Sequence, residues 1–205
     1  GITEIIIEGS RSNDLLIDTR AFAGCNNIET VTFRGNESGN PDAGVTTIGT
    51  SAFENVKQLR TVVFESGANV AIGDRAFATN EKLYTVTYAD GSVISSIGAE
   101  AYAGCVQLTE AIIPATTQSV GNGAFSGCEG ILNVTFQPDG QNVSFGSNIF
   151  EGCKKLTTIN LPATIGTFDG SVFAGCDAIT EIIVDEGNEN FATYNSALYS
   201  ANYEE

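Results

Sequence analysis

The chain has 205 residues, with 25 acidic and 9 basic side chains, a formal net charge of −16 and no histidine. This surplus of carboxylates repels phosphate backbones, which excludes nucleic acid as an expected partner, and no apolar run is long enough for direct membrane insertion. Without imidazole there is no Ser-His-Asp or Cys-His couple and no histidine-based metal site, so we expect no catalytic residue, metal or cofactor.

A thirteen-residue block recurs along the chain, with an aromatic ring at its second position. The blocks occupy residues 21–33, 52–64, 76–88, 101–113, 124–136, 149–161 and 172–184. Their rings are Phe22, Phe53, Phe77, Tyr102, Phe125, Phe150 and Phe173, in steps of 31, 24, 25, 23, 25 and 23 residues. Such a period predicts a solenoid of stacked coils, each of which buries its apolar face against its neighbours.

Each block ends in an apolar pattern of the form L-x-x-L-x-L. The first example carries Ile28, Val31 and Phe33, and the same spacing recurs in the later blocks. Alternation at the end of this pattern is typical of a half-buried strand, so we predict one strand per coil. Residues 1–8 fit the same pattern and are expected to be part of a further repeat.

Between ring and strand, the blocks read A-F-x-G-C-x-x-L or a close variant. Apolar spacing of three and four residues is typical of a short helical turn, which we predict in each coil. A second signature lies four residues before most rings, where an apolar residue is followed by glycine, as in Ile48-Gly49 and Ile97-Gly98.

One elongated domain is expected over residues 1–205, with two irregular regions. Residues 34–44 have a turn-forming composition that predicts a loop on one face of the solenoid. The segment from about 187 to 205 is expected to be a variant or capping repeat. Loops 137–142 and 185–190 contain carboxylates and amides, but turn chemistry accounts for them and neither matches a calcium-loop template.

All five cysteines stand three residues after a ring, at Cys25, Cys105, Cys128, Cys153 and Cys176. The other two blocks have Val56 and Asn80 at this position, which indicates a small interior site rather than a metal or redox centre. We therefore expect a ladder of buried, reduced thiols. Disulfides between stacked coils are the alternative, since neighbouring Cα atoms could come within about 4.4 to 6.8 Å.

The polar residues between the apolar positions of each strand are the candidate binding face. They point away from the core because side chains alternate across a strand, and parallel stacking places them in two outward columns. The candidates are Glu4, Thr30, Thr32, Thr61, Thr85, Thr87, Glu110, Asn133, Thr135, Thr158, Asn160 and Glu181. Plain sheet surface is the alternative, because threonine favours strands intrinsically.

The motif I-G-x-x-A-F-x-G-C-x-x-L-x-x-I-x-[LF] resembles that of the BspA-like, or Treponema pallidum type, leucine-rich repeats, over residues 1 to about 187. The resemblance implies a curved α/β repeat solenoid with one parallel β-strand per repeat and short helical or 3-10 turns on the convex side. Five of the seven repeats depart from it, because they lack the usual proline after the strand that Pro114 and Pro162 provide.

Members of that family are typically exported, surface-anchored bacterial proteins. The resemblance therefore implies an extracellular or cell-surface binding module for adhesion to host extracellular-matrix or microbial surface proteins, with a glycan as a second kind of ligand. It supplies no catalytic residues.

Two other functions stay open on the sequence. A right-handed parallel β-helix has coils of similar length and includes polysaccharide-acting enzymes, but it would need a further alternating strand where the ring motif stands. Lyase chemistry would also favour clustered charges, and the basic residues here are scattered. A structural spacer that displays another domain is the remaining alternative.

Overall fold

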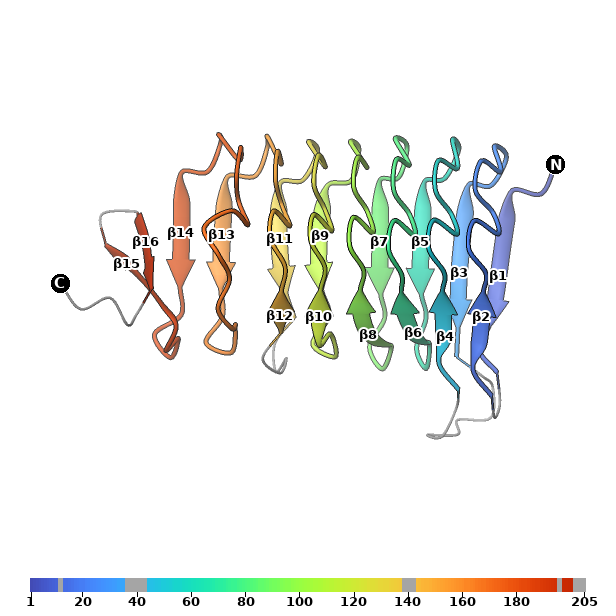
Figure 1. The fold of residues 1–205 in the computed structure, drawn as a ribbon, viewed down its shortest axis with the longest axis horizontal. Coiled ribbons are helices and arrows are strands. Elements are labelled where there is room, and N and C mark those ends of the chain that lie inside the picture. The colour runs from blue at the N-terminus through green and yellow to red at the C-terminus, as the bar shows by residue number, and fades with distance from the viewer. Residues whose placement is uncertain (11–12, 36–43, 138–142, 195–196, 201–205) are drawn as a thin grey trace.

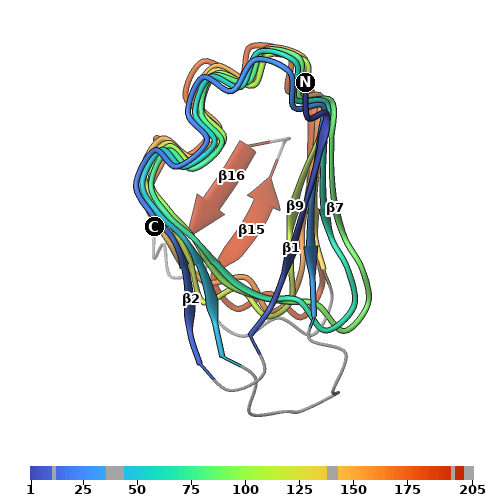
Figure 2. The ribbon, with the colours of Figure 1, turned by 90° about the vertical axis from the view of Figure 1, so that its right-hand side faces the viewer.

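The computed structural model describes residues 1–10, 13–35, 44–137, 143–194 and 197–200. Its coils stack in a row along one long axis (Figure 1), and they nearly superpose in the view down that axis (Figure 2), so neither view shows a pronounced bend. Most of the insertion predicted at 34–44 and most of the 137–142 loop lie outside the described residues.

The predicted strands form two parallel sheets along one side of the stack, here called the main face. The first sheet contains β1 (Glu4–Glu8), β3 (Thr30–Arg34), β5 (Thr61–Phe64) and β7 (Thr85–Tyr88). The second contains β9 (Glu110–Ile113), β11 (Asn133–Phe136), β13 (Thr158–Leu161) and β14 (Glu181–Val184). Val31 lies opposite Val62, and Val62 opposite Val86, so equivalent repeat positions stack and bury their β-branched side chains.

A third parallel sheet, with six strands, runs along the stack beside the two main-face sheets, so the prediction of one strand per repeat is wrong. It contains β2 (Leu15–Ile17), β4 (Thr46–Ile48), β6 (Asn69–Ile72), β8 (Val93–Ile97), β10 (Ser119–Val120) and β12 (Ser144–Phe145). In β6, Val70 and Ile72 are buried while Asn69 and Ala71 are half-buried. These strands are two to five residues long, and β10 and β12 have only two residues each, so the sequence showed no alternation that recurs in every coil.

The predicted helical turns are also wrong, because no helix occurs in the part of the chain that the structure describes. In the fourth coil the backbone makes successive β-turns, with Ala103 N–H donating to Glu100 O at 3.0 Å and Cys105 N–H to Tyr102 O at 3.2 Å. Glu100 and Gly104 have φ values of 53° and 72°. A helix needs every residue in the right-handed region, so left-handed residues two positions before and after the ring interrupt it. The α/β description therefore fails, and the fold is a β-solenoid.

These turns direct backbone donors to the next coil. Tyr102 N–H donates to Ala124 O at 2.8 Å, and Phe125 N–H donates to Ile149 O at 2.8 Å. The turn segments thus extend the hydrogen-bonded stacking between the sheets, which satisfies backbone groups that a helix would have satisfied locally.

The ring residues form a continuous stack through the core. Successive rings from Phe22 to Phe173 lie parallel, with centroids separated by 4.9 to 5.6 Å. Each such contact adds about 0.5 to 1.5 kcal/mol to the energy of burial alone.

Glycine precedes most rings because the coils approach closely at that point. A Cβ on Gly98 would lie 2.4 Å from the carbonyl carbon of Gly73, and a Cβ on Gly73 would lie 2.3 Å from Ile48 O. A methyl group does not fit at either distance, which accounts for the recurring Ile-Gly pair.

A hairpin of β15 (Phe191–Tyr194) and β16 (Ala197–Ser200) lies at the C-terminal end of the stack. Figure 2 shows it across the cross-section of the coils. Phe191 stacks on Phe168 with centroids 4.4 Å apart, and Asn188 Nδ2 donates to Pro162 O at 2.8 Å. The hairpin therefore packs against the last coils through Phe191, and the segment before it adds a polar contact through Asn188.

Candidate functional site

The candidate binding residues share the main face. Thr30 lies opposite Thr61, and Thr61 opposite Thr85, in the first sheet. In the second sheet, pairing places Glu110, Asn133, Thr158 and Glu181 in one row. The second column is likewise aligned through Thr32, Thr87, Thr135 and Asn160 and their apolar register partners. The geometry of both columns matches the expectation from strand alternation, while their role in binding stays a prediction.

Thr32 is an exception, since it is only 6% exposed. Its register partners on the main face are Ile6 and Val63, whose larger side chains flank its hydroxyl on both sides. Thr32 is therefore buried, and the expectation that it is exposed on the binding face is wrong.

Glu110 and Glu181 do not form a catalytic pair. Two strands, with Asn133 and Thr158 at the equivalent positions, separate them. At about 4.8 Å per strand the separation is roughly 14 Å, which exceeds the range used by glycosidase carboxylates. Glu110 Oε1 instead accepts a hydrogen bond from Thr135 Oγ1 at 2.6 Å.

A third outward column consists of the residue immediately before each of seven main-face strands, and it was not predicted from the sequence. It comprises Glu29, Arg60, Tyr84, Thr109, Leu132, Thr157 and Thr180. Arg60 N–H donates to Glu29 O at 2.8 Å and Tyr84 N–H to Arg60 O at 2.9 Å, so these residues are neighbours across coils. Tyr84 is 56% exposed and Leu132 is 46% exposed. The sequence feature that could have predicted this column is the pair of residues between the first two apolar positions of L-x-x-L-x-L, both of which face outward.

The turn side of the first three coils has an open polar hollow of about 670 Å³. It is lined by Arg20, Ala23, Gly24, Ser51, Glu54, Asn55, Arg75 and Thr79. Arg75 Nη2 donates to Glu54 Oε1 at 2.6 Å, and Nη1 pairs with Glu100. The hydrogen bond from Arg75 holds the pKa of Glu54 below its usual value, so this carboxylate is ionised near neutral pH and does not suit general acid catalysis.

The cysteine position is an inter-coil hydrogen-bonding site. Each buried thiol donates to the carbonyl of the preceding ring residue, for example Cys128 Sγ to Tyr102 O at 3.1 Å and Cys176 Sγ to Phe150 O at 3.0 Å. All five cysteines are free. Cys25 is exposed rather than buried, because no ring residue precedes it in the stack.

Burial raises the pKa of the Cys128 thiol, which keeps it protonated and poorly nucleophilic. Within the described ranges, no group of three or more cysteine, aspartate or glutamate residues could hold a metal ion. The thiols thus act as donors inside the core.

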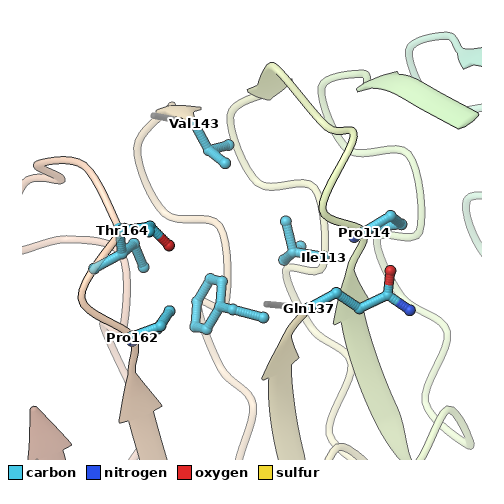
Figure 3. Close-up of a pocket in the computed structure, with 8 residues that line it drawn as sticks. Ile113, Pro114, Gln137, Val143, Pro162 and Thr164 are labelled. Atoms are coloured by element: carbon cyan, nitrogen blue, oxygen red, sulfur yellow. The ribbon is translucent and has the colours of Figure 1, made fainter. Parts of the chain in front are cut away.

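A small cavity lies between successive coils near the ends of the main-face strands (Figure 3). It is lined by Ile113, Pro114, Phe136, Gln137, Val143, Pro162, Thr164 and Ile165. Its volume of about 20 Å³ has room for a single water molecule but not for a ligand. No helix in the described ranges could span a bilayer.

The stacked parallel coils and their ring motif define a leucine-rich-repeat solenoid. The sequence profile described as "BspA type Leucine rich repeat region" matches in six copies, over residues 2–95 and 95–204. The chain therefore belongs to the BspA-type leucine-rich-repeat family. Repeat proteins of this family are generally interaction modules without enzymatic activity. Membership of this family excludes the alternative of a right-handed parallel β-helix, although the six-stranded sheet runs along the stack besides the main-face sheets.

Solved structures show the same fold at low sequence identity. A leucine-rich repeat protein from Bacteroides ovatus has 23% identity and a TM-score of 0.66, covering 91% of this chain and 43% of that protein. The pneumococcal vaccine antigen PcpA has 20% identity and a TM-score of 0.70, covering 98% and 50%. The Treponema pallidum leucine-rich repeat protein has 22% identity and a TM-score of 0.60, covering 83% and 74%.

The chain thus spans about half the length of the Bacteroides and pneumococcal structures. No curated protein matches the sequence.

Proposed function

We propose that this chain is an extracellular or cell-surface binding module that mediates adhesion to a protein on a host matrix or a microbial surface. A surface glycan is the second candidate ligand. Membership of an interaction-module family supports a binding role. A pneumococcal protein with a similar fold is a vaccine antigen, and this favours exposure to the outside.

The main face is the observation that carries the proposal. Its outward columns run in register along the stack and combine threonine hydroxyls with exposed Tyr84 and Leu132. Aromatic side chains are enriched in protein interfaces, and repeated elements commonly create extended binding surfaces of this kind. An extended surface of this kind suits a macromolecular partner better than a small molecule.

A binding screen with matched surface variants tests this proposal. The immobilised chain is presented with matrix proteins, glycans and microbial surfaces, and each hit is repeated with Thr61→Arg in β5 and Thr47→Arg in β4. Thr61 lies on the main face, while Thr47 is half-buried in the six-stranded sheet. We expect Thr61→Arg to weaken binding about tenfold or more, because a long charged side chain prevents close packing at an interface core, and Thr47→Arg to change it less than twofold.

Equal loss in both variants would argue against the main face as the binding surface. Consistent absence of binding would favour a structural spacer. Cleavage of acidic polysaccharides by the purified chain would contradict the non-enzymatic role, and antibody labelling of intact producing cells tests the proposed surface exposure.

A further inference from the structure

The basic residues of this acidic chain are unevenly placed. Arg34, Arg75 and Lys154 each form ion pairs with glutamates. Five other basic residues form no ion pair with any residue that the structure describes: Arg20, Lys57, Arg60, Lys82 and Lys155. Three of these, Lys57, Arg60 and Lys82, lie in the second and third coils, where turn joins strand, and are here called the cationic patch.

Two residues of the patch, Lys57 and Lys82, line a surface hollow of about 370 Å³. The hollow is lined by Asn55, Lys57, Gln58, Thr79, Glu81 and Lys82. Lys82 Nζ donates to Gln58 Oε1 at 2.7 Å, which positions the ammonium group at the junction of the two coils. The lining has two cations and a single acid, Glu81, although the whole chain carries a net charge of −16.

Arg60, the third residue of the patch, lies beside Tyr84 on the main face. Tyr84 N–H donates to Arg60 O at 2.9 Å, so the two residues occupy adjacent coils at the same repeat position. Both side chains are exposed. Arginine and tyrosine are the residue types most often found at the energetic centres of protein interfaces, and guanidinium binds carboxylate through two parallel hydrogen bonds.

We propose that the cationic patch docks a short acidic segment of the protein partner, with Arg60 and Lys82 binding its carboxylates and Tyr84 packing against an adjacent side chain. This inference rests on the proposed binding function and names the chemistry of the partner. Glu29 precedes Arg60 in the third column, and Glu110 begins the strand that follows Tyr84 along the stack. A long polyanionic glycan along the axis would meet these carboxylates, whereas a short acidic loop fits within two coils.

The test uses a fluorescein-labelled peptide with a short run of glutamates around one leucine, and the same peptide with glutamines. Binding is measured by fluorescence anisotropy at low and high salt. The variant is Arg60→Gln/Lys82→Gln, and the matched control is Lys154→Gln/Lys155→Gln, which removes the same charge from the sixth coil. Lys155 occupies the same repeat position as Lys82, five residues after the ring.

We expect the patch variant to bind the glutamate peptide about fivefold more weakly and the control variant to change affinity less than twofold. Added salt should weaken wild-type binding, because exposed charges are screened. Equal loss in both variants, or equal binding of the glutamine peptide, would overturn the proposal. So would patch-dependent binding of a heparin-derived oligosaccharide without binding of the glutamate peptide. If the peptide binds through the patch but the surface screen finds no ligand, the adhesion role is contradicted, whereas the proposal for the cationic patch is supported.

Discussion

Asn80 occupies the position of the cysteines and makes more contacts than they do. Its Nδ2 donates to Phe53 O at 2.9 Å and to Phe77 O at 2.7 Å, while its Oδ1 accepts from Val56 N–H at 2.7 Å. The side chain is fully buried. One amide thus joins two coils through three hydrogen bonds, where a thiol makes one.

Replacing Asn80 by alanine should lower the free energy of unfolding by about 3 kcal/mol, because buried backbone groups lose their partners. The midpoint of urea unfolding, followed by circular dichroism, measures the change. Asn80→Cys is the comparison, since a thiol can donate to Phe53 O as in other coils and so restores one of the three hydrogen bonds, and its cost should be smaller, about 2 kcal/mol. Equal destabilisation by both substitutions would contradict a hydrogen-bonding role for this position.

Residue burial was predictable from the repeat wherever a full coil lies on either side. Cys105, Cys128, Cys153 and Cys176 are buried as expected, because their position points into the stack. Cys25 and Thr32 differ, since their exposure depends on neighbouring coils rather than on their own block. A periodic pattern records the average environment of a position and not its local neighbours.

The turn segment is the element for which the sequence-based prediction, a short helical turn, is wrong. Five blocks have glycine two residues after the ring, at Gly24, Gly104, Gly127, Gly152 and Gly175, and all have positive φ. Asn55 and Thr79 occupy the same position with φ values of 54° and 57°. Recurrent glycine was therefore the available signal for left-handed residues, but three-and-four apolar spacing suits a chain of turns as well as a helix.

A reciprocal exchange at this turn position tests the backbone requirement. Thr79→Gly should stabilise the chain by up to about 1 kcal/mol, because a β-branched residue is strained at positive φ. Gly127→Thr should destabilise it by about 1 to 2 kcal/mol, although a Cβ there would approach no atom closer than 3.8 Å. Thermal unfolding of both variants gives the comparison, and destabilisation by Thr79→Gly would contradict the assignment.

At the scale of the molecule, stability depends on contacts between adjacent coils. The parallel sheets, turn ladder and ring stack all join a coil only to its neighbours. Such arrays behave as a line of units coupled to nearest neighbours, so disruption at one interface can separate the units on either side.

Gly98→Ala places a methyl group against the backbone of Gly73 in the middle of the stack. We expect it to cost about 3 kcal/mol and to split urea unfolding into two transitions, because the central interface no longer couples the two halves. Gly170→Ala is the matched control, since a Cβ there meets no atom within 4 Å, and its effect should stay within about 0.5 kcal/mol. A single, unshifted transition for Gly98→Ala would rule out this coupling.

Strand alternation predicted the main-face columns, because outward positions follow directly from the buried ones. The third column lies just before the strands, where alternation does not apply, and the hydrogen bond from Tyr84 N–H to Arg60 O shows that its residues are neighbours across coils. The clustering of Lys57 and Lys82 was equally hidden, since the basic residues look scattered until the coils are stacked. The periodic residues therefore determine the fold, and the irregular residues form the surface that distinguishes this chain.

The direction of the thiol hydrogen bonds has a consequence for biosynthesis. Each buried cysteine donates backwards, to a ring carbonyl that stands earlier in the chain, as Cys105 does to Phe77 and Cys153 to Phe125. During translation that acceptor has already left the ribosome when its donor emerges. At about 5 to 20 residues per second a new coil appears every few seconds, so each can dock on a completed template, and the array can assemble in the order in which it is synthesised.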